Sequence, residues 1–200
     1  MRRLTLDDIA DIRAYERERE AFRAHVIALK KRRRIAVGPV VTLLFENRDT
    51  IRFQIQEMAR VEKLVTDEAI QDELDIYNPM IPERGTLAAT MFIELTSDEQ
   101  VREWLPKLVG IERSVVFRLP DGDPRGITVR AVTEEQHETQ LTRADVTAAV
   151  HYIRFELSPA QIAAFDGPVV LAIDHPNYRE EIELLPETVE ELRTDLLGAS

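Results

Sequence analysis

Short β-rich runs and longer segments of helical periodicity alternate along this chain in no regular order, and this mixture constrains the fold most. Strands are predicted at residues 40–45, 85–95, 111–119, 126–132, 147–157 and 169–173. Helices are predicted near residues 5–30, 47–65, 67–76 and 186–197, with two more beginning after Ser97 and Ser158. Because no βαβ rhythm is visible, we expect an α+β fold. It would be a single domain over residues 1–200, a mostly antiparallel mixed sheet packed with about five or six helices.

The N-terminal helix is indicated by its first turn. Thr5 is a good N-cap residue, and Asp8 follows three residues later, as in a capping box. We expect this helix to cover about residues 5–30. The highly charged stretch 15–20 is a candidate break between two shorter helices.

The segment 51–56 fits two structures. Its apolar and polar residues alternate strictly, which is typical of a strand in a hairpin. Ile51 and Ile55 also share one helical face, and Asn47 is a good N-cap residue. The continuation is plainly helical, so a helix from about Asn47 to Val65 is favoured.

The chain contains no cysteine. This excludes disulfides, thiolate zinc sites, self-ligated iron–sulfur clusters and cysteine nucleophiles. The basic start lacks the apolar segment of a secretory signal, and no apolar run is long enough to span a bilayer. We therefore expect a soluble cytoplasmic protein that holds no cofactor.

The formal net charge of −11 is unevenly distributed. Residues 1–34 carry 11 Lys and Arg against 6 Asp and Glu, whereas the remainder is strongly acidic. A negative field opposes binding to nucleic acid and to anionic membranes. The basic run 30–34 is the exception. It is interpreted either as a helix C-terminus whose cations complement the helix dipole, or as a contact for an anionic ligand or acidic partner.

Familiar catalytic and nucleotide-binding motifs are absent. There is no GxxxxGK[ST] or GxGxxG sequence, and no serine lies in a GxSxG motif. The four histidines are too far apart in sequence to form a helical metal-binding pair. His151 alternates with apolar residues, which indicates a hydrogen-bonded histidine in the core.

Two polar clusters remain as candidate sites. Asp174, His175 and Tyr178 follow a buried strand, where a loop meets a rigid scaffold. They fit either a site with a titratable histidine or a turn held by local hydrogen bonds. The second cluster covers residues 46–57, where polar and large apolar residues interleave, so the polar groups need partners. Either a satisfied internal network or a polar pocket would supply them.

Three segments carry a resemblance to a known family: residues 42–58, 77–82 and 174–178. Together they resemble the bacterial family called domain of unknown function 3501, over nearly the whole chain. The family has no assigned activity, so the resemblance implies no catalytic residues. It does imply a gene located beside those of rubrerythrin-like and iron–sulfur oxidoreductase proteins, and therefore a role in redox or peroxide metabolism.

Three hypotheses follow. In the first, the protein is a non-enzymatic accessory that binds a redox protein. A homodimer is also compatible with the sequence. In the second, it is a small-ligand-binding protein or enzyme, in which Arg48 or Arg52 clamps an anion and Glu57 or His175 acts as base. In the third, Glu46 or Glu57 binds a divalent metal with His175. The candidate ligand-binding residues are Glu46, Arg48, Arg52, Gln56, Glu57, Tyr77, Asn78, His175 and Tyr178.

Overall fold

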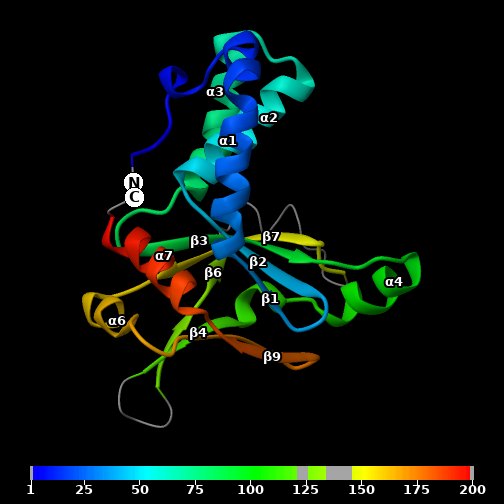
Figure 1. Ribbon diagram of the computed structural model, residues 1–200. Coiled ribbons are helices and arrows are strands. Elements are labelled where there is room, and N and C mark those ends of the chain that lie inside the picture. Colours follow the sequence, from blue (N-terminus) through cyan, green and yellow to red (C-terminus); the bar gives the residue numbers. More distant parts are fainter. Residues whose placement is uncertain (1, 121–125, 134–145, 199–200) are drawn as a thin grey trace.

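The structure, a computed structural model, describes residues 2–120, 126–133 and 146–198. It confirms the α+β class, with six α-helices in the described part and two antiparallel sheets in place of the one expected (Figure 1). Sheet A has the strand order β1 (Arg34–Val37), β2 (Val41–Glu46), β3 (Thr86–Ile93), β7 (Val150–Glu156) and β6 (Val132–Thr133). Sheet B has the order β5 (Ile127–Arg130), β4 (Val115–Leu119), β8 (Val170–His175) and β9 (Tyr178–Glu183).

The main core lies between the two sheets. Side chains alternate across a strand, so one face of each sheet supplies this core. Phe45 and Phe155 come from sheet A and Phe117 from sheet B, with ring centroids of Phe117 and Phe155 4.6 Å apart. His151 lies on the same face and is 4% exposed, and its Nε2 lies 2.9 Å from the hydroxyl of Thr147. The prediction of a hydrogen-bonded core histidine is confirmed.

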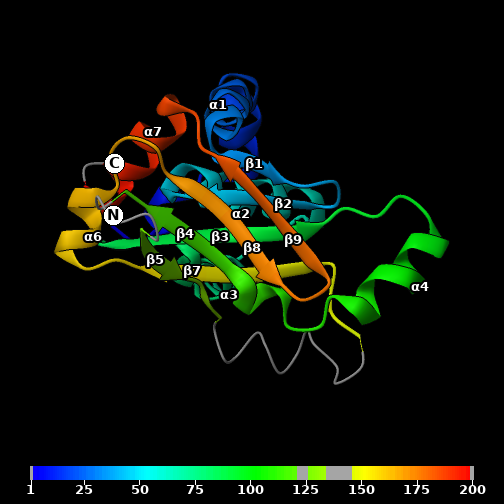
Figure 2. The same ribbon diagram turned by 90° about the horizontal axis from the view of Figure 1, so that it is seen from below.

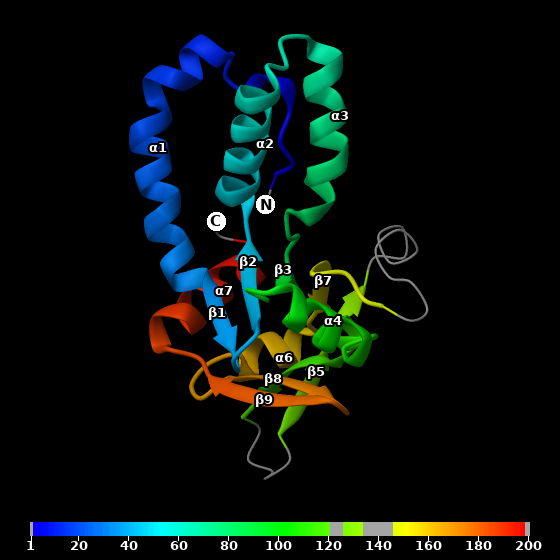
Figure 3. The same cartoon turned by 90° about the vertical axis from the view of Figure 1, so that its right-hand side faces the viewer.

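Three helices stand on the other face of sheet A, away from sheet B (Figures 1 and 3). They are α1 (Ile12–Arg33), α2 (Arg48–Glu62) and α3 (Asp67–Tyr77), with the short 3₁₀ helices η1 (Leu6–Asp8) and η2 (Asn78–Met80) beside them. A smaller apolar cluster holds this layer together and consists of Leu4, Ile51, Ile55, Leu74, Met80 and Ile81.

The remaining helices flank the sheets (Figure 2). They are α4 (Asp98–Lys107), α6 (Pro159–Ala164) and α7 (Pro186–Leu197), and the 3₁₀ helix η3 (Ile111–Ser114) precedes β4. In the part of the chain that the structure describes, no helix is both long and apolar enough to cross a bilayer.

The basic run at residues 30–34 has its acidic partner inside the same chain. Arg33 is 1% exposed and forms two hydrogen bonds with Asp195 on α7, at 2.6 and 3.0 Å. Glu191 on α7 accepts from Arg33 and Arg32. The end of α1 is therefore fixed to α7.

The expected N-terminal helix needs a correction. Thr5 and Asp8 do form a capping box, but it caps only the 3₁₀ turn η1. The α-helix begins at Ile12, because Asp11 caps it by accepting from the amides of Arg13 and Ala14. The charged stretch 15–20 is no break and lies inside α1. The ambiguous segment 51–56 is helical, as favoured. The sequence predicts a surface loop or short helix at residues 133–145, and residues 134–145 of this stretch lie outside the described residues.

Candidate functional site

The helix-facing side of sheet A carries polar residues in register. Glu46, the last residue of β2, lies opposite Ala88 of β3, and Ala88 lies opposite Arg154 of β7. In the next row Leu44 lies opposite Thr90, which lies opposite Tyr152. Alternate residues of the same strands enter the core between the sheets. Because side chains alternate between the two faces of a strand, these polar residues all lie on the face that the helices cover.

A cleft of about 320 Å³ lies between this face and the helical layer. Its floor is formed by strand residues of β2, β3 and β7, and its walls by the end of α1, the first turns of α2, and the end of α3 with η2. The floor residues are Leu44, Glu46, Thr90, Phe92, Val150 and Tyr152. The wall residues are Lys30, Arg34, Thr50, Ile51, Gln54, Tyr77 and Met80.

Glu46 is the most deeply placed charge of the cleft, at 7% exposure. Its carboxylate accepts hydrogen bonds from the hydroxyls of Thr50 at 2.5 Å and Thr90 at 2.7 Å. Within the described residues, Glu46 takes part in no ion pair with a Lys, Arg or His. The N-terminus of α2, which Asn47 caps, follows directly and offers a partial positive charge. Buried carboxylates normally have a full counter-charge, whereas within the described residues this one has two hydroxyl donors and the partial charge of the helix N-terminus.

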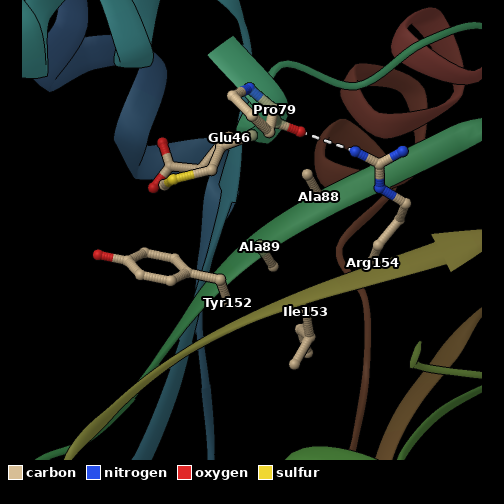
Figure 4. A pocket seen from close by; sticks show the side chains of 8 residues that line it. Glu46, Pro79, Ala88, Ala89, Tyr152, Ile153 and Arg154 are labelled. Atoms are coloured by element: carbon tan, nitrogen blue, oxygen red, sulfur yellow. Dashed lines mark hydrogen bonds between the residues drawn. The ribbon is translucent and has the colours of Figure 1, made fainter. Parts of the chain in front are cut away.

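Two phenols lie near this carboxylate. Burial raises the pKa of Tyr152, and the charges of Tyr77 and Glu46 raise it further. The hydroxyl of Tyr152 and the carboxylate of Glu46 point to the same side of the sheet (Figure 4). Arg154 lies on the same face, two residues further along β7, and donates a 2.7 Å hydrogen bond to the carbonyl of Pro79 (Figure 4). Between these groups an adjoining cavity of about 10 Å³ has room for roughly one water molecule.

The outer end of the cleft is basic. Arg34 pairs with Glu94, and its guanidinium lies 5.2 Å from the centroid of the Phe92 ring. Lys30 Nζ lies 5.6 Å from the centroid of Phe53 and has no carboxylate partner within the described residues. The cleft is therefore acidic at its base and basic at its mouth.

Four of the candidates predicted from the sequence hold the N-terminal segment instead of lining the cleft. Asn78 accepts a hydrogen bond from the amide of Leu4 at 2.8 Å and donates to its carbonyl at 2.9 Å. Gln56 makes the same reciprocal pair with Ala10, at 2.8 and 3.1 Å. Their side-chain amides are thus occupied by backbone.

Arg48 and Arg52 act on the same segment. Arg48 pairs with Asp8 at 2.6 Å and donates to the carbonyl of Arg2. Arg52 donates to the carbonyl of Asp8 at 2.8 Å and pairs with Glu18 on α1 at 2.6 Å. These contacts match the internal network that the sequence left open as the alternative to a pocket.

Glu57 joins α2 to α1. Its carboxylate accepts from the hydroxyl of Tyr15 at 2.7 Å and from two nitrogens of Arg19, at 2.7 and 2.9 Å. The hydrogen bond from Arg19 is the largest influence on the pKa of Glu57, which falls from 4.5 to about 2. A carboxylate with these partners is a poor base at neutral pH.

His175 and Tyr178 lie at the turn between β8 and β9, in sheet B. One ring nitrogen of His175 lies 3.1 Å from the carbonyl of Val109, and the other accepts from the amide of Asn177. The hydroxyl of Tyr178 donates to the carbonyl of Val37 at 2.7 Å and accepts from the amide of Val40. Tyr178 therefore joins the β1–β2 hairpin of sheet A to sheet B, and His175 joins the β8–β9 turn to the segment between α4 and η3.

The candidates therefore divide. Glu46 and Tyr77 line the cleft together, whereas the other seven lie in the contacts described above. The cleft also contains Thr50, Thr90 and Tyr152, which sequence reasoning missed. Within the described residues, no group of three or more His, Asp or Glu side chains is placed to hold a metal ion.

Comparisons with known proteins give a family and a fold. A model of the family described as "Protein of unknown function (DUF3501)" matches residues 3–196. The chain is similar to a novel protein of unknown function from Burkholderia pseudomallei K96243, whose crystal structure superposes with a TM-score of 0.87. The two are 38% identical, over 98% of this chain and 100% of that one. No curated protein matches. The chain belongs to the DUF3501 family of proteins of unknown function.

Proposed function

We propose that this protein binds a small polar molecule in the cleft between the helical layer and sheet A, with Glu46 as the anchor. One observation carries the proposal. Glu46 is 7% exposed at the base of a cleft of about 320 Å³, and two threonine hydroxyls are its hydrogen-bond donors. A buried carboxylate without a counter-ion is costly, so a ligand that supplies the missing charge would stabilise the protein on binding.

The composition of the cleft supports a small-molecule ligand. Small-molecule sites are concave, mostly apolar, and contain a few polar groups that orient the ligand. Here Leu44, Ile51 and Phe92 supply apolar surface, and Glu46 and Tyr152 supply polar groups. The volume is at the lower end of the usual range of roughly 300–1,000 Å³, which favours a ligand of few atoms.

The experiment is a titration of ¹⁵N-labelled protein with a library of amines, carboxylates, sugars and nucleosides. We expect at least one compound to shift the amide signals of Thr50, Thr90 and Tyr152 together, and Glu46→Gln to weaken that response. Glu62→Gln on the exposed end of α2 is the matched control. The proposal is wrong if no compound shifts these amides. It is also wrong if shifts occur only in the separate groove between the N-terminal segment and the α2–α3 loop.

The redox partner implied by the family resemblance stays a separate prediction. A pull-down at low salt from the native host tests it, and it loses its support if no redox protein is recovered.

A further inference from the structure

We propose that the ligand of the cleft is a small zwitterion, with an ammonium group at Glu46 and an anionic group at Lys30, joined by an apolar chain. This inference rests on the proposed function and adds the chemical class of the ligand. It follows from the different chemistry of the base, the middle and the mouth of the cleft.

The base of the cleft fits an ammonium group. The carboxylate of Glu46 already accepts one hydrogen bond from each of two hydroxyls, and each carboxylate oxygen has further acceptor capacity. An ammonium group has three donors and a full positive charge, and both are missing from the protein's own contacts at this position. Tyr77 and Tyr152 line the cleft beside Glu46, and aromatic faces attract cations.

A metal ion fits the base less well. Divalent cations in proteins take several oxygen or nitrogen ligands, commonly including more than one carboxylate or histidine. Among the residues that the structure describes, Glu46 is the one carboxylate that lines the cleft, and no histidine lines it. An organic cation needs one carboxylate, hydrogen-bond acceptors and aromatic surface, which are the groups present.

The mouth of the cleft fits an anion. Lys30 reaches it from the last turns of α1 and makes no ion pair within the described residues, while its Nζ lies 5.6 Å from the Phe53 ring centroid. Arg34 also lines the mouth, but its charge is shared with Glu94. Lys30 therefore has the least compensated positive charge in the cleft.

The middle of the cleft sets the character and length of the ligand. Leu44 lies in the row between those of Glu46 and Phe92, and Ile51 of α2 also lines the cleft, so the connecting chain is apolar. Glu46 lies opposite Ala88, and Phe92 at the mouth is four residues further along β3. At about 3.3 Å per residue, these rows are about 13 Å apart, and the Lys30 side chain covers part of that span. A short aliphatic ω-amino carboxylate meets these requirements.

The experiment compares three probes of equal chain length by titration calorimetry: ε-aminocaproate, hexylamine and caproate. We expect ε-aminocaproate to bind at least about tenfold more tightly than either probe with one charge, because both ends then find a partner. Glu46→Gln should weaken ε-aminocaproate and hexylamine about tenfold or more. Lys30→Met should weaken ε-aminocaproate and caproate and leave hexylamine unchanged. Lys31→Met, on the exposed side of α1, is the matched control. Each variant is used after its melting curve shows a cooperative transition.

Other outcomes overturn the inference. If hexylamine binds as tightly as ε-aminocaproate and Lys30→Met has no effect, the ligand has no anionic group at Lys30. If caproate binds most tightly, or if Glu46→Gln binds ε-aminocaproate as the wild type does, the ligand has no ammonium group at Glu46. If none of the three binds while another library compound shifts the cleft amides, the zwitterion is wrong and the proposed function stands. If no library compound shifts them, both are wrong.

Discussion

The hydroxyl of Tyr15, whose side chain is fully buried, donates a 2.7 Å hydrogen bond to the carboxylate of Glu57. Arg19 binds both oxygens of the same carboxylate from one turn further along α1. Burial raises the pKa of Tyr15 above its usual value, and the hydrogen bond to Glu57 raises it more. The charged middle of α1 therefore faces α2, which explains why it continues as a helix where the sequence suggested a break.

This arrangement predicts a loss of stability in acid that depends on Glu57. Its pKa is about 2 in the folded protein and 4.5 without its partners, so the unfolded chain binds more protons between these values. The stabilisation is complete above pH 4.5 and is lost as the pH falls toward 2, by about 1–3 kcal/mol in total. Glu57→Gln should remove this part of the pH dependence, as measured by urea unfolding across that range. Glu62→Gln should retain it, and equal slopes for Glu57→Gln and the wild type would contradict the prediction.

The N-terminal segment is held by contacts that local sequence patterns do not predict. Interleaved polar and apolar residues in 46–57 correctly indicated buried polar groups that need partners. The partners of Gln56 and Asn78 are backbone groups of Ala10 and Leu4, 46 and 74 residues away in sequence. No local pattern encodes such contacts, so the same residues were also compatible with a ligand pocket.

Removing either side-chain amide should release the N-terminal segment. Asn78→Ala leaves the amide and carbonyl of Leu4 without partners, at a cost of about 1–3 kcal/mol in unfolding free energy. The measurement is hydrogen exchange, and we expect the Leu4 amide to exchange faster in this variant. Gln71→Ala on the exposed side of α3 should change neither quantity. Unchanged protection of Leu4 in Asn78→Ala would contradict the prediction and show that the other contacts of the segment are sufficient to hold it.

The contact between Arg33 and Asp195 predicts a large asymmetry between single and double variants. Both side chains are 1% exposed or less, so removing Asp195 leaves the buried Arg33 with Glu191 as its one remaining carboxylate partner within the described residues. Asp195→Asn should cost about 3–5 kcal/mol, whereas Arg33→Met combined with Asp195→Leu should recover much of that loss. The control is Asp166→Asn, because its 3.4 Å pair with Arg193 is exposed and worth less than about 1 kcal/mol. A small effect of Asp195→Asn in urea unfolding would mean that Glu191 alone compensates Arg33.

The cleft itself was only partly predictable. Glu46 was identified because it belongs to the segment 46–57, in which polar and large apolar residues interleave. Thr90 and Tyr152 carried a weaker signal: each occupies a polar-compatible position on a strand whose alternate residues are apolar. Parity assigns them to a face, but their row follows from the register of β2, β3 and β7, which are distant in sequence. The sheet order, and with it the cleft, depends on those long-range pairings.

The last prediction separates a binding role of Glu46 from a structural one. If the Glu46 carboxylate binds a ligand cation, its buried charge has no counter-ion in the ligand-free protein and destabilises the fold there. Glu46→Gln keeps the size and a carbonyl acceptor and removes the charge, so its unfolding free energy should equal the wild-type value or exceed it by up to about 2 kcal/mol.

Thr90→Val provides the opposite case. It removes one of the two hydroxyl donors and leaves the Glu46 charge less solvated, at a cost of about 1–3 kcal/mol. In the Glu46→Gln background the same change should cost less, and a double-mutant cycle in urea measures the difference. A loss of more than about 1 kcal/mol in Glu46→Gln alone would identify the carboxylate as a structural group and count against the cleft as a binding site. If Glu46→Gln keeps its stability but no longer responds to ligand, the Glu46 carboxylate is instead a binding group that does not stabilise the ligand-free protein.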